Sequence, residues 1–147
     1  MKRIKILLGI TLILTQGVNT VYADDDVELV QLMSSLQYFS HKLGLSIDSS
    51  NKELASFYAH EVEEVLEEAE KVMAYDGFPV GKMVESTVKP AFEKLEDAVK
   101  AANWKQADKA FDDLVSSCNS CHQATAHGYI KLERRRDNPY MQSFHAE

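Results

Sequence analysis

Apolar residues recur at helical spacing along most of this 147-residue chain, and no stretch shows the strict alternation of a half-buried strand. The first helical pattern runs from about Val27 to Ile47. The second follows capping residues at positions 49–51 and extends to about Tyr75. Their apolar faces are Leu29, Leu32, Met33, Leu36, Leu43 and Ile47 in the first and Leu54, Tyr58, Val62, Val65, Ala69 and Val72 in the second.

Two further helical patterns follow a break at residues 76–79 (DGFP). Pro90 either kinks the third helix, or a short segment ends at Lys89 and Pro90 is the first residue of a longer one. Asn103 is expected to cap the fourth helix, which should stop near Gly128. The apolar faces are Val84, Val88, Phe92, Leu95, Ala98 and Val99 in the third and Ala107, Ala110 or Phe111, Leu114, Cys118 and Cys121 in the fourth.

Four amphipathic helices with short connections predict an all-α fold, an antiparallel four-helix bundle over residues 24–128. Residues 129–147 show no helical or strand period. We expect them to form a short irregular tail that packs on the bundle or is partly disordered.

Residues 1–23 have the order of a secretory signal peptide. Basic Lys2, Arg3 and Lys5 precede an apolar run that is too short to span a bilayer, and small residues stand at Val21 and Ala23. We therefore expect cleavage after Ala23 and a periplasmic mature protein that is not embedded in the membrane. Losing three basic residues moves the formal charge from -7 to -7 - 3 = -10, which makes nucleic acid an improbable partner.

The chain has two cysteines, and both lie in the stretch CNSCH, Cys118 to His122. A disulfide across this spacing would close almost no loop and would give little stabilisation. Two thiols one helical turn apart can instead each bond to one vinyl group of a haem, and His122 can bind the iron from the proximal side. This pattern is the attachment signal of c-type haem.

Two other kinds of site use a CxxC pair. A thioredoxin-like dithiol would stand at the start of a helix in an α/β pattern, whereas this pair comes near the end of a helix in a chain without strand patterns. A structural zinc site would need two more ligands. His127 and His145 are present, but no second paired motif is. The sequence therefore favours one covalently bound haem c.

The signal segment, the four helical patterns and CxxCH on the last helix resemble the cytochrome c′ family and its low-spin relatives, over roughly residues 27–128. The resemblance implies a haem between the first and last helices, attached at Cys118 and Cys121, with His122 as proximal ligand. Two features depart from the family: Ala126 stands where a basic residue is frequent, and a tail of about twenty residues follows the motif.

The sixth position of the iron should face the first helix, because in an antiparallel bundle its start lies beside the end of the fourth. Met33 is the candidate distal ligand, although it could equally be an ordinary core residue. His41 is a weaker rival, away from the centre of the apolar stripe. His60 is expected to face water, and His127 to end the helix or lie at the haem edge; for His145 the sequence gives no role.

The expected function is one-electron transfer by a mono-haem c-type cytochrome that is not an enzyme. The alternative is a protein of cytochrome c′ type that binds nitric oxide or carbon monoxide beneath Leu29, Leu32, Met33 or Leu36, and a haem-free dithiol oxidoreductase is a third class. The expected partner is a redox protein, and a basic one would suit the acidic surface of this chain. The chain could also pair with itself as a homodimer. Residues 134–136 (RRR) form a basic run that is expected to be solvated, or to pair with a haem propionate or an acidic partner.

Overall fold

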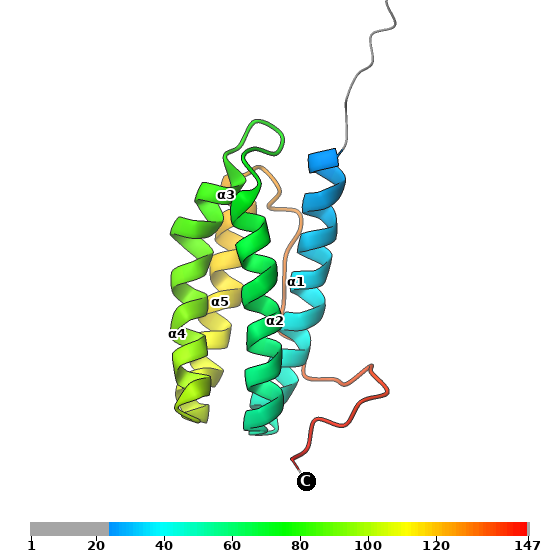
Figure 1. Ribbon diagram of the computed structural model, residues 1–147, viewed down its shortest axis with the longest axis vertical. Coiled ribbons are helices and arrows are strands. Elements are labelled where there is room, and N and C mark those ends of the chain that lie inside the picture. Colours follow the sequence, from blue (N-terminus) through cyan, green and yellow to red (C-terminus); the bar gives the residue numbers. More distant parts are fainter. Residues whose placement is uncertain (1–23, 147) are drawn as a thin grey trace, which may run out of the picture.

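A computed structural model of the chain describes residues 24–146, so the expected signal peptide lies outside the described residues. The helical elements are α1 (Asp24–Asp48), α2 (Lys52–Lys71), α3 (Val80–Met83), the π-helical turn η1 (Val84–Val88), α4 (Lys89–Lys100) and α5 (Trp104–Ala124). Since α3, η1 and α4 follow one another directly, they form one bent helix. Successive helices run in opposite directions (Figure 1), which confirms the predicted all-α antiparallel four-helix bundle.

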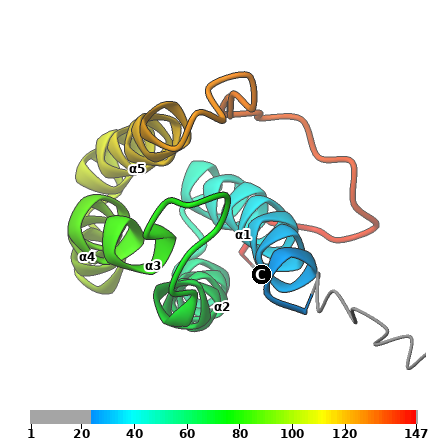
Figure 2. The same ribbon diagram turned by 90° about the horizontal axis from the view of Figure 1, so that it is seen from above.

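The helices pack as two pairs. α1 lies mainly on α2, and α4 lies mainly on α5, with fewer contacts between α1 and α5. Seen from above, the chain after α5 runs along the outside of the bundle from α5 to α1 (Figure 2). No helix among the described residues is long and apolar enough to cross a membrane.

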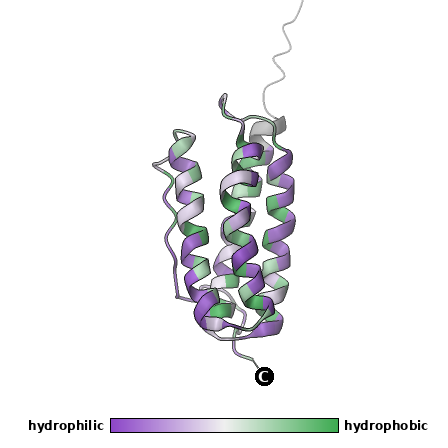
Figure 3. Ribbon diagram, turned by 90° about the vertical axis from the view of Figure 1, so that its left-hand side faces the viewer, coloured by the Kyte–Doolittle hydropathy of each residue, from purple (hydrophilic) through white to green (hydrophobic). Residues whose placement is uncertain are grey.

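The predicted apolar faces form the core. Hydrophobic residues recur among hydrophilic ones along each helix (Figure 3), and every predicted core residue of the third helix is buried. In α2 the buried residue is Leu66 rather than the predicted Val65. In α1, Leu43, Leu45 and Ile47 are buried, whereas Met33 is only partly so. The start and the end of α1 are therefore packed differently.

Asparagine caps begin two of the helices, as the sequence predicts. The Asn51 side chain accepts a hydrogen bond from the backbone N–H of Leu54 (3.1 Å), and Asn103 accepts one from Gln106 (3.2 Å). Ser50 and Ala102, the residues directly before the two capping asparagines, both have a positive φ of 52°, and the chain turns there. These caps give the tight connections that an antiparallel bundle needs.

Three predicted helix ends were wrong by a few residues. α1 begins at Asp24 rather than near Val27. α2 ends at Lys71 rather than Tyr75, because the backbones of Tyr75 and Phe78 exchange two hydrogen bonds (both 2.9 Å) and close a turn. α5 ends at Ala124 rather than near Gly128: Ala126 adopts a φ of 62°, and the His127 N–H bonds to the His122 carbonyl (2.7 Å).

The bend in the third helix comes before Pro90, not at it. Pro90 lies in the first turn of α4, where its missing N–H costs little. The preceding turn widens to π geometry, in which the Lys89 N–H bonds to the Val84 carbonyl. Of the two arrangements that the sequence allowed, the structure is closer to a short first segment followed by a longer one, with the boundary at Val88.

Residues 125–146 form a tail that packs on the bundle. It descends beside α5 and then crosses to the lower ends of α1 and α2 (Figures 1 and 2). Its last anchor is Phe144, which is 4 % exposed and whose carbonyl accepts a hydrogen bond from Asn51 (3.2 Å). The tail therefore covers one side of the gap between α1 and α5.

Candidate haem site

A cavity of about 600 Å³ lies between α1, α5 and the tail. This volume is within the range of roughly 300–1,000 Å³ that is usual for ligand sites. Its back wall is made by aliphatic side chains of α2 and of the bent third helix, Val62, Leu66, Val80, Val84 and Val88. Among the neighbouring pairs of long helices, α1 and α5 are in least contact, and the cavity lies between them. This explains why Met33 and Leu36 in the upper half of α1 are only partly buried.

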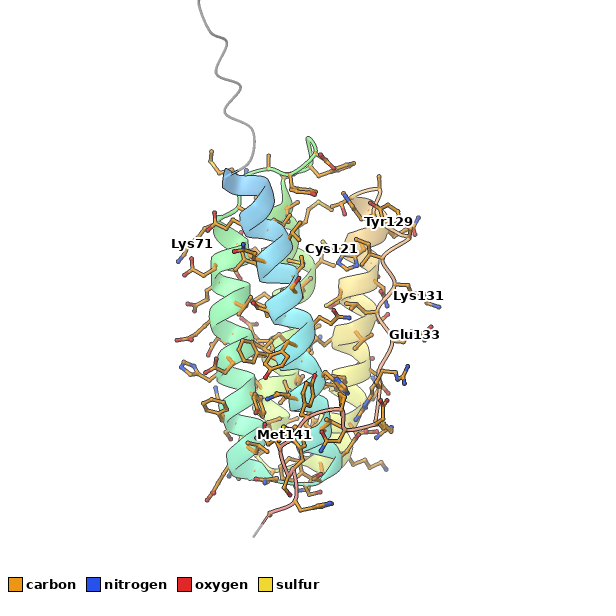
Figure 4. All side chains as sticks on the ribbon, turned by 90° about the vertical axis from the view of Figure 1, so that its right-hand side faces the viewer. Lys71, Cys121, Tyr129, Lys131, Glu133 and Met141 are labelled. Carbon is orange, nitrogen blue, oxygen red and sulfur yellow. The ribbon has the colours of Figure 1, made fainter. Side chains whose placement is uncertain are left out.

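Both motif cysteines line this cavity, one turn apart on α5. Cys121 is buried and Cys118 is partly buried, and both thiols are free. In Figure 4, Cys121 lies in the upper half of the molecule, in the space between α1 and α5. Both thiols therefore border one largely apolar cavity whose opposite wall is α1.

Burial raises the pKa of the Cys118 thiol to about 11, and burial also raises the pKa of Cys121. A redox-active dithiol needs the opposite shift, because the thiolate is the nucleophile. Neutral thiols in an apolar wall do not suit thiol–disulfide exchange near neutral pH. This observation disfavours the oxidoreductase alternative.

His122 also lines the cavity, and its ring is held by the tail. Its Nδ1 lies 2.8 Å from the backbone carbonyl oxygen of Ile130. A carbonyl can only accept, so Nδ1 carries the proton and donates. Nε2 of the neutral ring then keeps its lone pair, which is the atom and the tautomer that a metal ligand requires.

The α1 wall of the cavity contains the predicted distal candidate. Met33 lines the cavity, together with Leu29 and Leu36 of the same apolar stripe. Leu32, which the gas-binding alternative also included, packs against the core but is not among the lining residues. Met33 is the only thioether in the lining, and all other α1 residues of the stripe in the cavity are aliphatic.

His41 also lines the cavity, although its sequence position suggested that it would point away. Its Nε2 donates to the Asp137 carbonyl (3.1 Å), and its Nδ1 pairs with the Tyr140 hydroxyl (3.0 Å). Both ring nitrogens are thus engaged by the tail. His41 is poorly placed to bind iron unless these contacts break.

The remaining histidines lie outside the centre of the site. His60 is exposed beside Glu63 and Glu64, which confirms that it faces water. His127 follows the end of α5 and lines the cavity; its Nδ1 donates to the Thr125 carbonyl (2.7 Å), and its ring packs on the rings of Tyr75 and Tyr129.

His145 is exposed near the end of the tail, and the contacts of the structure give it no role either.

Arg134 contradicts the expectation that the whole basic run is solvated. Its side chain is 10 % exposed and pairs with Asp48 of α1 and with Asp108 (2.8 Å) and Asp112 (3.0 Å) of α5. Its guanidinium also lies 4.8 Å from the centre of the Phe111 ring. The expectation failed because these acids are remote in sequence. Arg135, at 68 % exposed, and Arg136, at 57 %, do remain largely in solvent.

A buried lysine packs beside Tyr38 and Tyr140, two residues of the cavity wall. Lys42 is 8 % exposed, and its Nζ lies 4.6–5.3 Å from the ring centres of Tyr38, Tyr58 and Tyr140. It donates to the Tyr58 hydroxyl (3.3 Å) and to Gln142 Oε1 (3.0 Å), and Tyr58 donates to the same oxygen (2.6 Å). Burial opposes the charge, but hydrogen bonds to Tyr38 and Tyr58 outweigh it and raise the pKa of Lys42.

The residues present fit a covalently bound haem. The cavity has a suitable volume, mostly apolar walls, two thiols on one turn and an imidazole whose free nitrogen is the metal-binding one. Among the described residues, no three His, Cys, Asp or Glu side chains come together to hold a bare metal ion. A porphyrin iron brings four nitrogen ligands of its own, so it needs only one or two from the chain.

Comparison of the chain with protein-family models, with curated proteins and with solved structures finds no match.

Proposed function

We propose that the chain is an exported mono-haem c-type cytochrome that transfers single electrons. The observation that carries this proposal is the position of Cys118, Cys121 and His122 together in the wall of one apolar cavity. A bound haem would supply an iron that alternates between the ferric and ferrous states. The resemblance to the cytochrome c′ family remains part of the proposal.

Each residue of the site has a separate role in this function. Cys118 and Cys121 would hold the cofactor by thioether bonds, so that it cannot dissociate. His122 would offer Nε2 to the iron, and the Ile130 carbonyl would keep the ring in the required tautomer. The aliphatic back wall would exclude water, which favours the less charged state of the site and so influences the reduction potential.

The coordination at Met33 decides between the proposed carrier and a gas-binding protein. If the Met33 sulfur binds the iron, the site is closed and low-spin, as suits an electron carrier. The second candidate function, binding of nitric oxide or carbon monoxide, is favoured by Leu29 and Leu36, the aliphatic residues that flank Met33 in the α1 stripe. Without the Met33 sulfur, and with both ring nitrogens of His41 engaged by the tail, the iron would stay five-coordinate.

The test is to express the full chain in a host with haem-attachment machinery and to measure the intact mass and the absorption spectrum. The proposal predicts one added haem and a mature chain that begins at Asp24. A low-spin spectrum that carbon monoxide does not change supports the carrier, and a high-spin one that shifts supports the gas binder. Met33→Ala should convert the first spectrum into the second. A mature chain without added haem would exclude both functions.

The partner would be a redox protein with a basic docking surface. The outer face of α2 carries Glu64, Glu67 and Glu68 in exposed positions, and the chain left after cleavage has a charge of about -10. Electron exchange with a basic small redox protein should therefore slow as salt is added, whereas exchange with an acidic one should accelerate. The same rate with both proteins would reject this surface as the docking site.

A further inference from the structure

We propose that Asn119 and the tail segment 130–134 form a device that positions the proximal histidine and tunes its basicity. This inference rests on the proposed function, because it concerns how the chain controls the haem ligand His122. The segment 130–134 lies outside the region that resembles the cytochrome c′ family. Its role is inferred entirely from the contacts that the structure shows.

Asn119 is one of the two inner residues of CNSCH, and it binds the tail through both atoms of its amide. Its Nδ2 donates to the Leu132 carbonyl (2.9 Å), and its Oδ1 accepts from the Leu132 N–H (2.8 Å). The side chain thus pairs with the backbone as a neighbouring strand would. Residue 132 is held against the turn of α5 that carries the motif.

The Ile130 carbonyl, which accepts from His122 Nδ1, lies two residues before this contact. Asn119 and His122 are themselves nearly one turn apart on α5. The same short piece of tail therefore makes its two contacts with the same part of the helix. Holding Leu132 fixes where the Ile130 carbonyl can lie.

Arg134 holds the other end of the segment. Its ion pairs join the tail to α5 through Asp108 and Asp112 and to α1 through Asp48, and its side chain is nearly buried. A planar guanidinium that is paired and stacked on Phe111 has little freedom to move. The segment is therefore fixed on both sides of Leu132 and cannot slide along the helix.

The chemical consequence concerns the electron density on His122. A hydrogen bond donated from one ring nitrogen to a carbonyl fixes the tautomer and makes the other nitrogen a stronger donor to a metal. A stronger donor stabilises the ferric state relative to the ferrous state. Asn119 and Arg134 should thus lower the reduction potential, as positioning residues that do not touch the cofactor.

The chain offers a matched control for each position. Ser120, the other inner residue of the motif, is exposed and donates only to the Ser116 carbonyl of its own helix (2.9 Å). Arg135 follows Arg134 but is 68 % exposed and pairs only with Asp137, two residues away. Ser120→Ala and the charge-conserving Arg135→Lys change the same motif and the same basic run without releasing the segment.

The experiment uses the haem-loaded full-length protein, with loading verified by mass. Two quantities are measured: the exchange rate with heavy water of the His122 Nδ1 proton, by proton magnetic resonance, and the reduction potential. Asn119→Ala should speed exchange by roughly tenfold, which is the effect of losing one or two hydrogen bonds. It should also raise the potential. Asn119→Asp keeps the acceptor for the Leu132 N–H but loses the donor, so its effects should be smaller.

Arg134→Gln provides an independent route if Asn119 variants load poorly. It should change both quantities in the same direction as Asn119→Ala, while Ser120→Ala and Arg135→Lys leave both at the wild-type values. If haem-loaded Asn119→Ala and Arg134→Gln proteins keep the wild-type exchange rate and reduction potential, the inference is wrong and the proposed function still stands. A wild-type chain that carries no haem would overturn the proposed function, and the inference with it.

Discussion

The two halves of α1 are packed in different ways. In the lower half, residues 42–47 are all buried, and an added Cβ at Gly44 would come within 3.0 Å of the Phe111 ring. In the upper half, Leu29, Met33 and Leu36 border the 600 Å³ cavity, and two of the three are only partly buried. One helix thus takes part in a close-packed core and in the wall of a chamber.

The polar groups at the two ends of the cavity-bearing side of the bundle also differ. At the lower end, Lys42, Tyr58 and Gln142 satisfy one another. At the upper end, the thiols of Cys118 and Cys121 form no disulfide. Close packing stabilises the folded chain, whereas side chains that border a cavity lack van der Waals contacts that a bound ligand could supply. We infer that stability comes mainly from the lower half and that the upper half is kept for a cofactor.

Loss of the two thiols should have the largest effect on the upper half. The double variant Cys118→Ser, Cys121→Ser should carry no covalent haem by mass, because both thioether bonds are lost. Ser120→Ala should load as the wild type does. The double variant should still fold, with a helical circular dichroism spectrum, since neither thiol is part of the closely packed lower half. Covalent haem on the double variant would contradict the proposed attachment.

Leucine and methionine truncations on α1 compare the two halves directly. Leu43→Ala should lower the free energy of unfolding of the haem-free protein by about 2–5 kcal/mol, because Leu43 is fully buried. Met33→Ala should cost about 1 kcal/mol or less, since its side chain already borders empty space. Denaturant titration of both variants measures the difference. Equal losses would mean that the chamber wall is as well packed as the core.

Removal of the Tyr58 hydroxyl should destabilise the lower end of the bundle less than Leu43→Ala does. Tyr58→Phe removes the donor to Gln142 and an acceptor for Lys42 but keeps the ring beside the lysine. The free energy of unfolding should fall by about 1–2 kcal/mol, and the haem spectrum should stay unchanged. Tyr129→Phe, at an 80 % exposed position, is the control and should change neither. A spectral change in Tyr58→Phe would show that the two ends are coupled.

The smallest effect is expected from protonation of Asp108, the α5 carboxylate that pairs with Arg134 and Arg136 of the tail. Burial disfavours the Asp108 carboxylate, but Arg136 and Arg134 outweigh this and hold the pKa of Asp108 below its ordinary value. A lowered pKa in the folded state gives stability that is present above the ordinary pKa of about 4 and is lost as the pH falls through the lowered value.

The contribution of Asp108 should be about 0.5 kcal/mol or less, because its side chain is half exposed. Thermal unfolding of the wild type and of Asp108→Asn from pH 7 to pH 2 measures it. The two curves should differ above pH 4 and converge below it. A difference that grows as the pH falls would have the wrong sign for this ion pair.

The bundle and the motif could be predicted from the sequence because both are local signals. Helical spacing places Leu95 and Phe92 in the core from a window of a few turns, and asparagine caps mark where helices begin. The CxxCH spacing likewise puts Cys118 and Cys121 on one turn of α5. The prediction that Met33 is a ligand stays a prediction.

The tail could not be predicted because its contacts join residues far apart in the chain. Arg134 pairs with Asp48 across 86 positions, and His41 with Tyr140 across 99. Neither contact leaves a periodic signal. The π turn was missed for a different reason: Pro90 marks an interruption in a helix, but how the preceding turn adjusts depends on packing against α2 and α5.

The grip on His122 and Asn119 is made by main-chain atoms of Ile130 and Leu132. Side-chain identity at those two positions is therefore irrelevant to the grip, and substitutions can accumulate there as long as the backbone keeps its course. Proline at position 132 is the exception, because it has no N–H to give. Related chains could thus share the device while their tails look dissimilar, and a search for it should ask for an asparagine inside the motif.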